Sequence, residues 1–210
     1  MAYVLGFFTA DGSMIKNKRG AHFIEFQITD KDLLEKIREL LDSNHKIHAC
    51  KRNNRWKTRY RLQIGSKIIY TDLLKLGLTP NKSKTMKLPV VPEKYFPHFL
   101  RGYFDGDGNV TICTYKQKAR NNKLITTLQS GFTSGSKNFL ANLQNKLLKT
   151  GVVKGGTFYY SNNGWRLYFS INDSKQLYGY MYKGLSRNNN LFLKRKKIIF
   201  EKYFKINNNY

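Results

Sequence analysis

The sequence predicts an α+β protein made of two pseudo-symmetric halves, each with the element order αββαββα. Three observations support this prediction. A glycine-containing apolar stretch occurs twice, segments with period-two alternation follow each copy, and segments with one apolar helical stripe separate the strand pairs. A repeat present in only two copies in 210 residues indicates a pseudo-dimer rather than a solenoid. We expect residues 1–87 and 95–210 to form the two halves, with residues 88–94 as the linker.

The repeated stretch predicts a short apolar helix that ends in an Asp-Gly pair. The two copies read VLGFFTADG at residues 4–12 and LRGYFDGDG at residues 100–108. Small residues four apart lie on one helix face, as Gly6 and Ala10 do in the first copy and Gly102 and Gly106 in the second. Glycine inside a helix costs about 1 kcal/mol relative to alanine, so a compensating contact is expected. We predict that the two helices pack on each other through these small residues.

The acidic residues at the ends of these helices are the strongest candidates for chemistry. Packing of the two helices brings Asp11 and Asp107 side by side. Two carboxylates held close together repel each other unless a cation lies between them. Carboxylate oxygens suit a hard divalent ion, so the sequence predicts a magnesium site at the seam of the two halves.

The first half continues with two predicted hairpins and two helices. The first hairpin joins residues 12–16 to residues 22–28, where alternation directs Ile24, Phe26 and Ile28 towards the core. Thr29 or Asp30 caps the next helix. The apolar stripe of that helix consists of Leu33, Leu34, Ile37, Leu40 and Leu41.

The second hairpin of this half is predicted at residues 46–52 and 56–64. The strand at 56–64 has one polar face, formed by Lys57, Arg59, Arg61 and Gln63. Lys46, His48 and Arg52 lie on the neighbouring strand. Three cations and an amide on one exposed face are suited to phosphates and base edges. Ser66 caps the helix that follows, which ends before Gly77.

The second half repeats the order. Strands are expected at residues 109–116, 124–133, 156–160 and 165–171, and helices at 136–148, 174–182 and 191–204. Arg166, Tyr168 and Ser170 are placed on one strand face. Each half therefore yields a four-stranded antiparallel sheet with helices on one side. The two open sheet faces would form a concave basic surface suited to a DNA duplex.

The composition points to a nucleic-acid partner. The chain has 38 Lys and Arg residues against 13 Asp and Glu residues, giving a net charge of +25. Such an excess self-repels unless an anionic partner is present. The two cysteines lack metal-ligand spacing and a disulfide pattern, so a reduced intracellular setting is expected. No stretch has the length and apolarity of a membrane span, and no targeting segment is expected before the first helix.

The paired stretches resemble the signature of the LAGLIDADG homing endonucleases, in the form that carries two motifs in one chain. The resemblance implies the saddle-shaped architecture and adds the carbonyl groups of Ala10 and Gly106 as metal ligands beside Asp11 and Asp107. It implies Mg²⁺ or Mn²⁺ as cofactor, with Ca²⁺ binding without supporting cleavage. Thr9 departs from the acidic residue of many family motifs, a place that is mostly structural.

Further site residues follow from the same resemblance. Gln27 matches a glutamine that orders water beside the metal, although an ordinary base-contacting role is an equal alternative. Thr133 is its counterpart in the second half, and Gln129 is a substitute nearby. Lys82 and Lys194 match basic residues near the scissile phosphates. Plain phosphate binding is the alternative for both, with Lys84 and Lys196 as competitors for the role.

The sequence thus predicts a metal-dependent, site-specific double-stranded DNA endonuclease that acts as a monomer on a long asymmetric target. Two alternatives share its fold: an RNA maturase that assists group I intron splicing, with intron RNA as partner, and a DNA-binding regulator without cleavage. Retention of both carboxylates favours the nuclease. The expected location is intracellular, with the DNA of a bacterial or organellar genome, in an intron rather than an intein.

Overall fold

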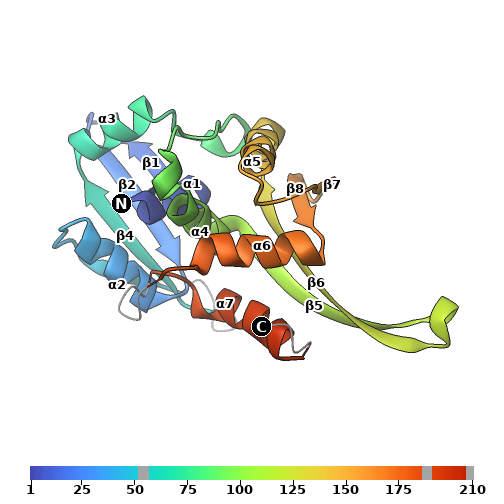
Figure 1. Cartoon of the computed structure of the whole chain (residues 1–210). Helices are drawn as coiled ribbons and strands as arrows, with labels where there is room; N and C mark the ends of the chain where they lie inside the picture. The colour runs from blue at the N-terminus through green and yellow to red at the C-terminus, as the bar shows by residue number, and fades with distance from the viewer. Residues whose placement is uncertain (52–56, 186–190, 207–210) are drawn as a thin grey trace.

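The computed structural model describes residues 1–51, 57–185 and 191–206, and it confirms the α+β class (Figure 1). The first half contains α1 (Ala2–Asp11), β1 (Gly12–Lys16), β2 (His22–Ile28), α2 (Lys31–Leu40), β3 (Ile47–Cys50), β4 (Arg59–Gly65) and α3 (Lys67–Lys75). The second half contains α4 (Phe96–Asp107), β5 (Gly108–Gln117), β6 (Lys123–Ser134), α5 (Lys137–Lys149), β7 (Thr157–Ser161), β8 (Gly164–Phe169), α6 (Ile171–Tyr182) and α7 (Lys194–Ile206). Short 3₁₀ turns are η1 (Lys82–Lys84), η2 (Glu93–Tyr95) and η3 (Lys118–Arg120).

The two sheets are antiparallel and have matching topology. Their strand orders are β1-β2-β4-β3 and β5-β6-β8-β7. Gly12 pairs with Phe26 in the first sheet, as Gly108 pairs with Phe132 in the second. Because the register is the same, each residue of one open sheet face has a defined equivalent on the other. The predicted pseudo-symmetry is therefore confirmed at the level of single residues.

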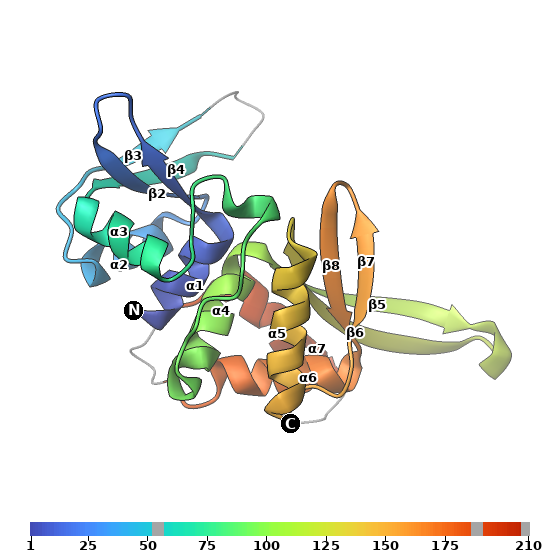
Figure 2. The same ribbon diagram turned by 90° about the horizontal axis from the view of Figure 1, so that it is seen from above.

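The motif helices α1 and α4 pack directly against each other between the two sheets (Figure 2). A Cβ atom on Gly6 would lie 2.0 Å from the carbonyl oxygen of Phe99. A Cβ atom on Gly102 would lie 2.1 Å from the carbonyl oxygen of Tyr3. Both distances are far below van der Waals contact, so only glycine allows the backbones to approach this closely. The predicted role of the small residues is confirmed.

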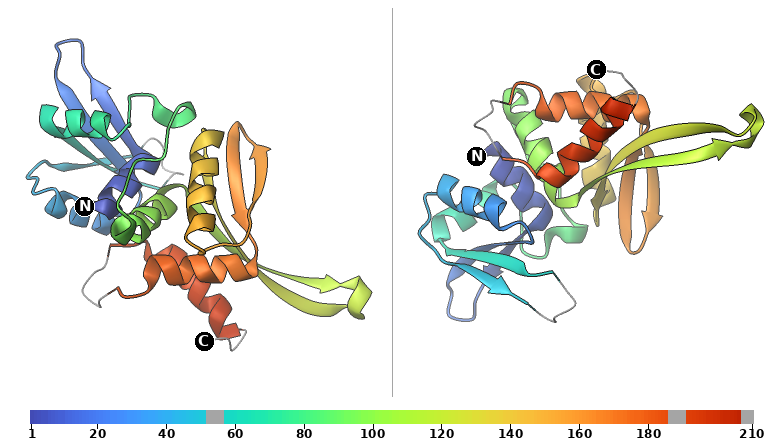
Figure 3. Two further views of the ribbon diagram at one scale, coloured as in Figure 1. Left: turned by 45° about the horizontal axis from the view of Figure 1, so that its top comes forward. Right: turned by 90° about the horizontal axis from the view of Figure 1, so that it is seen from below.

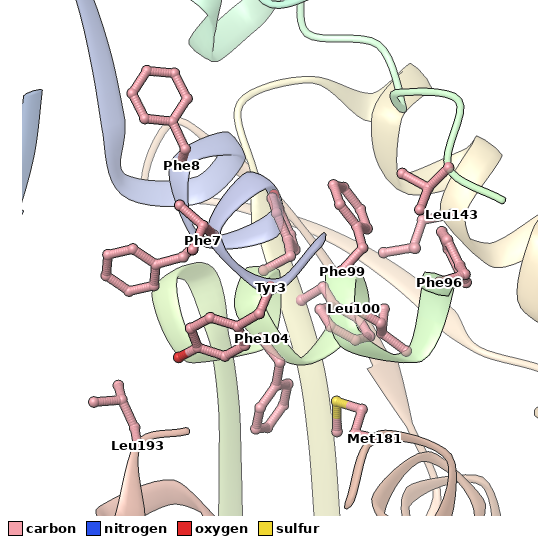
Figure 4. Packing of buried hydrophobic residues seen from close by; sticks show 14 of the residues in the cluster. Tyr3, Phe7, Phe8, Phe96, Phe99, Leu100, Phe104, Leu143, Met181 and Leu193 are labelled. Carbon is pink, nitrogen blue, oxygen red and sulfur yellow. The ribbon is translucent and has the colours of Figure 1, made fainter. Parts of the chain in front are cut away.

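Aromatic side chains from the same helices anchor the core. Phe7 and Phe8 reach the first sheet, where their rings lie 6.4 Å and 5.2 Å from the ring of Phe26. In the second half the ring of Phe104 lies 5.7 Å from that of Phe132. In Figure 4 the side chains of Phe8 and Phe104, one from each motif helix, point away from each other. Each motif helix therefore contributes both to the interface and to the core of its own half.

The halves differ in their last helix and in the length of their first hairpin. Helix α7 has no full-length counterpart in the first half, where only the single turn η1 occupies the corresponding place in the chain. The β5–β6 hairpin has strands of 10 and 12 residues, against 5 and 7 in β1–β2, and it projects well beyond the body of the protein (Figure 3).

Several predicted details needed correction. Leu40, the last residue of α2, is 45% exposed and does not belong to the buried stripe of that helix. Helix α6 begins at Ile171 rather than Ser174, with Ser170 as its N-cap.

Ser66 caps α3 as predicted, and its hydroxyl oxygen accepts a hydrogen bond from the Ile69 amide at 3.2 Å. Within the described ranges no helix has the length and apolarity needed to cross a membrane.

Candidate active site and nucleic-acid interface

Asp11 and Asp107 are the last residues of α1 and α4, and each is followed by a glycine that begins a strand. The helices still touch at this end. A Cβ atom on Gly106 would lie 2.4 Å from the Ala10 Cβ and 3.1 Å from a carboxylate oxygen of Asp11. The Asp11 carboxylate therefore lies against the residue next to Asp107. The structure brings the two predicted carboxylates together at the seam.

The two carboxyl groups affect each other's protonation. Desolvation, and next the charge of Asp11, raise the pKa of Asp107 to about 6, while Lys196 and Lys82 oppose the rise. Desolvation also raises the pKa of Asp11, against the lowering effect of Lys196 and Lys82. Asp11 is exposed as a whole residue, but its carboxyl group lies where the two helix ends crowd it. Close, partly desolvated carboxylates of this kind have unfavourable charge that a cation would relieve.

Two buried lysines lie beneath the carboxylates in equivalent positions. The Lys82 ammonium donates a hydrogen bond to the carbonyl oxygen of Gly12 and lies 5.4 Å from the centre of the Phe8 ring. The Lys196 ammonium donates to the carbonyl oxygens of Gly108 and Phe104, and lies 5.4 Å from the Phe104 ring. Each lysine therefore caps the C-terminal end of a motif helix, where a positive charge also favours the helix dipole.

This pairing corrects the prediction that Lys194 is the counterpart of Lys82. Lys194 is exposed at the first position of α7, whereas Lys196 is 6% exposed and Lys82 is 8% exposed. Lys84 is also exposed. Desolvation lowers the pKa of Lys82, and it lowers that of Lys196 to about 8, while nearby carboxylates, among them Asp107 and Asp11, oppose both changes. Both lysines thus place positive charge next to the carboxylate pair.

The donors at the seam fit a hard divalent cation. Two carboxylates and the backbone carbonyls of Ala10 and Gly106 are oxygen ligands, and magnesium often binds through one or two carboxylates with substrate phosphates and water. The Gly106 carbonyl oxygen also accepts a hydrogen bond from Lys196 at 3.2 Å. Among the described residues no group of three or more His, Cys, Asp or Glu side chains could hold a metal by itself. A metal here would therefore depend on phosphate or water to complete its ligand set.

Gln27 and Thr133 occupy equivalent places beside the two carboxylates. Each residue follows a phenylalanine, and that phenylalanine pairs with the first residue after a motif helix. Gln27 itself pairs with Arg61 on the next strand, and Thr133 pairs with Arg166. Gln27 is exposed, and its amide nitrogen donates a hydrogen bond to a carboxylate oxygen of Glu25 at 2.8 Å. The predicted equivalence is confirmed as geometry.

The remaining predicted interface residues of the first half lie around β3 and β4. Arg59, Arg61 and Gln63 alternate along β4 with buried Leu62 and Ile64, and His48 pairs with Arg61 from β3. Lys46 and Lys57 lie just before these strands and are exposed. Arg52 lies outside the described residues. The cationic strand face is therefore present, with its described cations open to a partner.

The second open face is less cationic and more aromatic. Arg166 and Tyr168 lie on one side of β8, and Gln129 is exposed on β6. Ser170 does not share this strand face, because the strand ends at Phe169 and Ser170 caps α6. By register, Tyr168 stands where the first sheet has Gln63. Tyr168 also accepts a hydrogen bond from the amide of Asn109 at 3.4 Å.

Sequence reasoning missed three residues of this region. Arg195 is close enough to the Asp11 carboxyl to favour its charged form. Glu25 is a buried carboxylate within the polar strand face, and Asn109 supports Tyr168. For the lysine pair the sequence carries no such signal, because an apolar residue follows both candidates at i+4, Ile198 after Lys194 and Phe200 after Lys196. Only the structure shows that Phe200 is buried and Ile198 is exposed.

Comparison with known proteins agrees with this geometry. Residues 1–80 match the family model described as a LAGLIDADG-like domain. The chain is 28% identical over 118 residues to an uncharacterized protein of Methanocaldococcus jannaschii, covering 53% of this chain and 39% of that one. It is 30% identical over 110 residues to the DNA-directed RNA polymerase subunit Rpo1C of the same organism, covering 51% and 12%. The matched part thus spans well under half the length of these relatives.

Solved structures match over nearly the whole chain. The LAGLIDADG meganuclease I-AabMI bound to uncleaved DNA has a TM-score of 0.68 at 16% identity, covering 98% of this chain and 89% of that one. The homing endonuclease I-SmaMI bound to cleaved DNA has a TM-score of 0.64 at 12% identity, covering 99% and 90%. I-SmaMI bound to uncleaved DNA in the presence of calcium ions has a TM-score of 0.58 at 15% identity, covering 98% and 92%. The likeness establishes the fold of the whole chain.

Proposed function

We propose that the chain is a LAGLIDADG-type protein with two motifs in one chain and that it cleaves double-stranded DNA at a specific site. The family model that matches residues 1–80 and the fold shared with DNA-bound meganucleases support this proposal. The observation that carries this proposal is the close approach of two carboxylates at the seam, each with a buried lysine beneath it. A DNA-binding regulator has no need of this costly arrangement of desolvated charges.

Asp11 and Asp107 would hold divalent metal, with the carbonyls of Ala10 and Gly106 as additional donors. When bound, such ions supply a nucleophilic water and stabilise charge on the attacked phosphate. The side chains of this protein have distinct tasks around them. Lys82 and Lys196 provide fixed positive charge next to the phosphates. Gln27 orients water on one side of the seam, where Thr133 has only a hydroxyl group to offer.

The open sheet faces would hold the duplex. Arg59, Arg61 and Lys57 in the first half, and Arg166 in the second, would bind phosphates, while Gln63 and Tyr168 reach base edges. Unequal residues at equivalent positions support an asymmetric target, since a symmetric enzyme would prefer a palindrome. We further propose that Mg²⁺ or Mn²⁺ supports cleavage, that Ca²⁺ supports binding alone, that the protein acts as a monomer, and that it works inside the cell in the homing of an intron.

The test is selection of cleaved sites from a random DNA library with Mg²⁺, followed by assay of Asp11→Asn and Asp107→Asn on the selected site. Both variants should lose double-strand cleavage while DNA affinity measured with Ca²⁺ or without metal stays within about threefold. Glu39→Asn is the matched control, because it removes an exposed carboxylate from α2, away from the seam. Metal-dependent cutting by both seam variants would contradict the assignment.

A further inference from the structure

Glu25 is a buried carboxylate that neither metal binding nor phosphate binding requires. It lies in the middle of β2, is only 7% exposed, and shares the open face of the first sheet with Gln27. A negative charge on a surface that binds a polyanion weakens that binding by repulsion. Its presence therefore needs another physical reason, and its contacts supply one.

Both carboxylate oxygens of Glu25 accept hydrogen bonds from side-chain amides. The amide nitrogen of Gln27 lies 2.8 Å from one oxygen, and that of Gln63 lies 3.2 Å from the other. The nearest guanidinium nitrogen of Arg61 is 3.9 Å away, a weak ion pair. With their nitrogens bound to Glu25, both glutamines are left to present their carbonyl oxygens to a ligand on the open face.

The second half has no such residue. By register Gly131 stands where the first half has Glu25. A Cβ atom there would lie 2.6 Å from the ring of Tyr168 and 2.7 Å from the carbonyl oxygen of Leu167. The tyrosine ring thus fills the place of the carboxylate, and Thr133 takes the place of Gln27. The two sides of the seam differ in this feature specifically.

We propose that Glu25 is a positioning residue that fixes the Gln27 amide beside the Asp11 side of the seam and so sets the cleavage rate of one DNA strand. The inference rests on the proposed nuclease function and assigns a cause to its asymmetry. The Gln27 side chain is exposed and has several rotatable bonds, so without a partner it would have to be ordered in each catalytic cycle. The buried carboxylate provides that order in advance, with Gln63 held by the same group.

The experiment compares Glu25→Ala and Glu25→Gln with wild type on supercoiled DNA carrying the selected site, with each strand labelled. Glu25→Ala should slow nicking of one strand by about 10- to 100-fold, and leave the other within about twofold. Glu25→Gln should fall between, because its amide oxygen still accepts one hydrogen bond. DNA affinity without metal should stay equal or become tighter, since a negative charge has been removed from the binding face.

Glu39→Gln is the matched control, because it makes the same substitution on the exposed side of α2. Equal slowing of both strands, or weaker DNA binding with a lower melting temperature, would show that Glu25 only supports the sheet and would overturn the inference. Unchanged nicking of both strands would overturn it as well. If wild type and Glu39→Gln cleave no DNA at all, the proposed nuclease function fails, and the Glu25 inference fails with it.

Discussion

The two halves of this protein place different residues on the same framework. Gln27 and Thr133 follow matched phenylalanines, Arg61 and Arg166 pair with them, and Lys82 and Lys196 cap matched helices. The phenylalanines, arginines and buried lysines of this framework are the same in both halves. The residues that face a ligand are not, since Glu25 and Gln63 are replaced by Gly131 and Tyr168.

This difference distinguishes the residues that hold the fold together from the residues that would contact a DNA target. Both halves need close helix packing and a seam in which lysines balance the carboxylates, because the two sides of the interface have the same geometry. The open faces carry no such constraint. One is a network of amides around a carboxylate, and the other is an aromatic face in which the rings of Tyr159 and Tyr168 lie 5.9 Å apart. The repeat therefore keeps the helix interface and its buried lysines constant, while the residues on the two open sheet faces differ.

The largest expected effect concerns the shared framework. Gly6→Ala and Gly102→Ala should each destabilise the protein by about 3 kcal/mol, because the new methyl group meets a backbone carbonyl oxygen that cannot move alone. Equal losses in chemical denaturation would confirm that the interface is symmetric. Gly179→Ala in α6 is the control, since its Cβ would meet nothing within 4 Å and helix propensity should raise stability by about 1 kcal/mol. A loss of stability in only one of the two glycine variants would show that the interface is not symmetric.

The next effect distinguishes the two lysines. Lys82→Met and Lys196→Met should both reduce cleavage by about 100-fold, because each removes fixed positive charge beside the carboxylates. Lys196→Met should also lower the melting temperature more, since its ammonium binds four carbonyl groups, at Phe104, Asp105, Gly106 and Gly108, and Lys82 binds one. Lys194→Met is the control for charge alone and should change neither property much. Loss of activity in that variant with retention in Lys196→Met would reverse the assignment.

The lysines also show where sequence reasoning succeeded and where it stopped. The repeated small residues were enough to predict the helix packing, because residues at i and i+4 share one helix face and small side chains there let another backbone approach. The family resemblance selects Gln27 and matches it to Thr133, and strand alternation places Gln27 on the polar face of its strand. These inferences use only local sequence, and the structure confirms the helix packing and the equivalent strand positions.

The errors arose where contacts depend on distant segments. The family resemblance pairs Lys82 with Lys194, but the lysine that reaches the helix end is decided by how α7 docks on α4. Strand alternation places Glu25 on the face opposite the core but does not show its burial, and side chains from the neighbouring strand cover it. Ser170 was extended into a strand that ends one residue earlier. The periodicity of one segment cannot show which of its side chains are buried by another segment.

The smallest expected effect concerns the hairpins. Each strand of β5–β6 is five residues longer than its counterpart, which extends the hairpin by about 17 Å, or about five base pairs of DNA. Residues 108–134 include no Asp or Glu, and Lys116, Lys118 and Lys123 lie at or beside the far end. We therefore expect the footprint on DNA to reach about five base pairs further on the side of the second half.

Replacing these three lysines with alanine should weaken binding to a long target. The slope of log K against the logarithm of the salt concentration should become less steep by up to about 2.7, since each phosphate contact contributes about 0.9. Targets trimmed by five base pairs on that side should bind wild type and variant alike. The matched control changes Lys16, Lys18 and Arg19 in the short β1–β2 hairpin, whose effect should persist on the trimmed target. The prediction is wrong if the long-hairpin variant binds more weakly than wild type by the same factor on the long and the trimmed targets. In that case the hairpin does not lie along the duplex, and the two halves contact DNA over equal lengths.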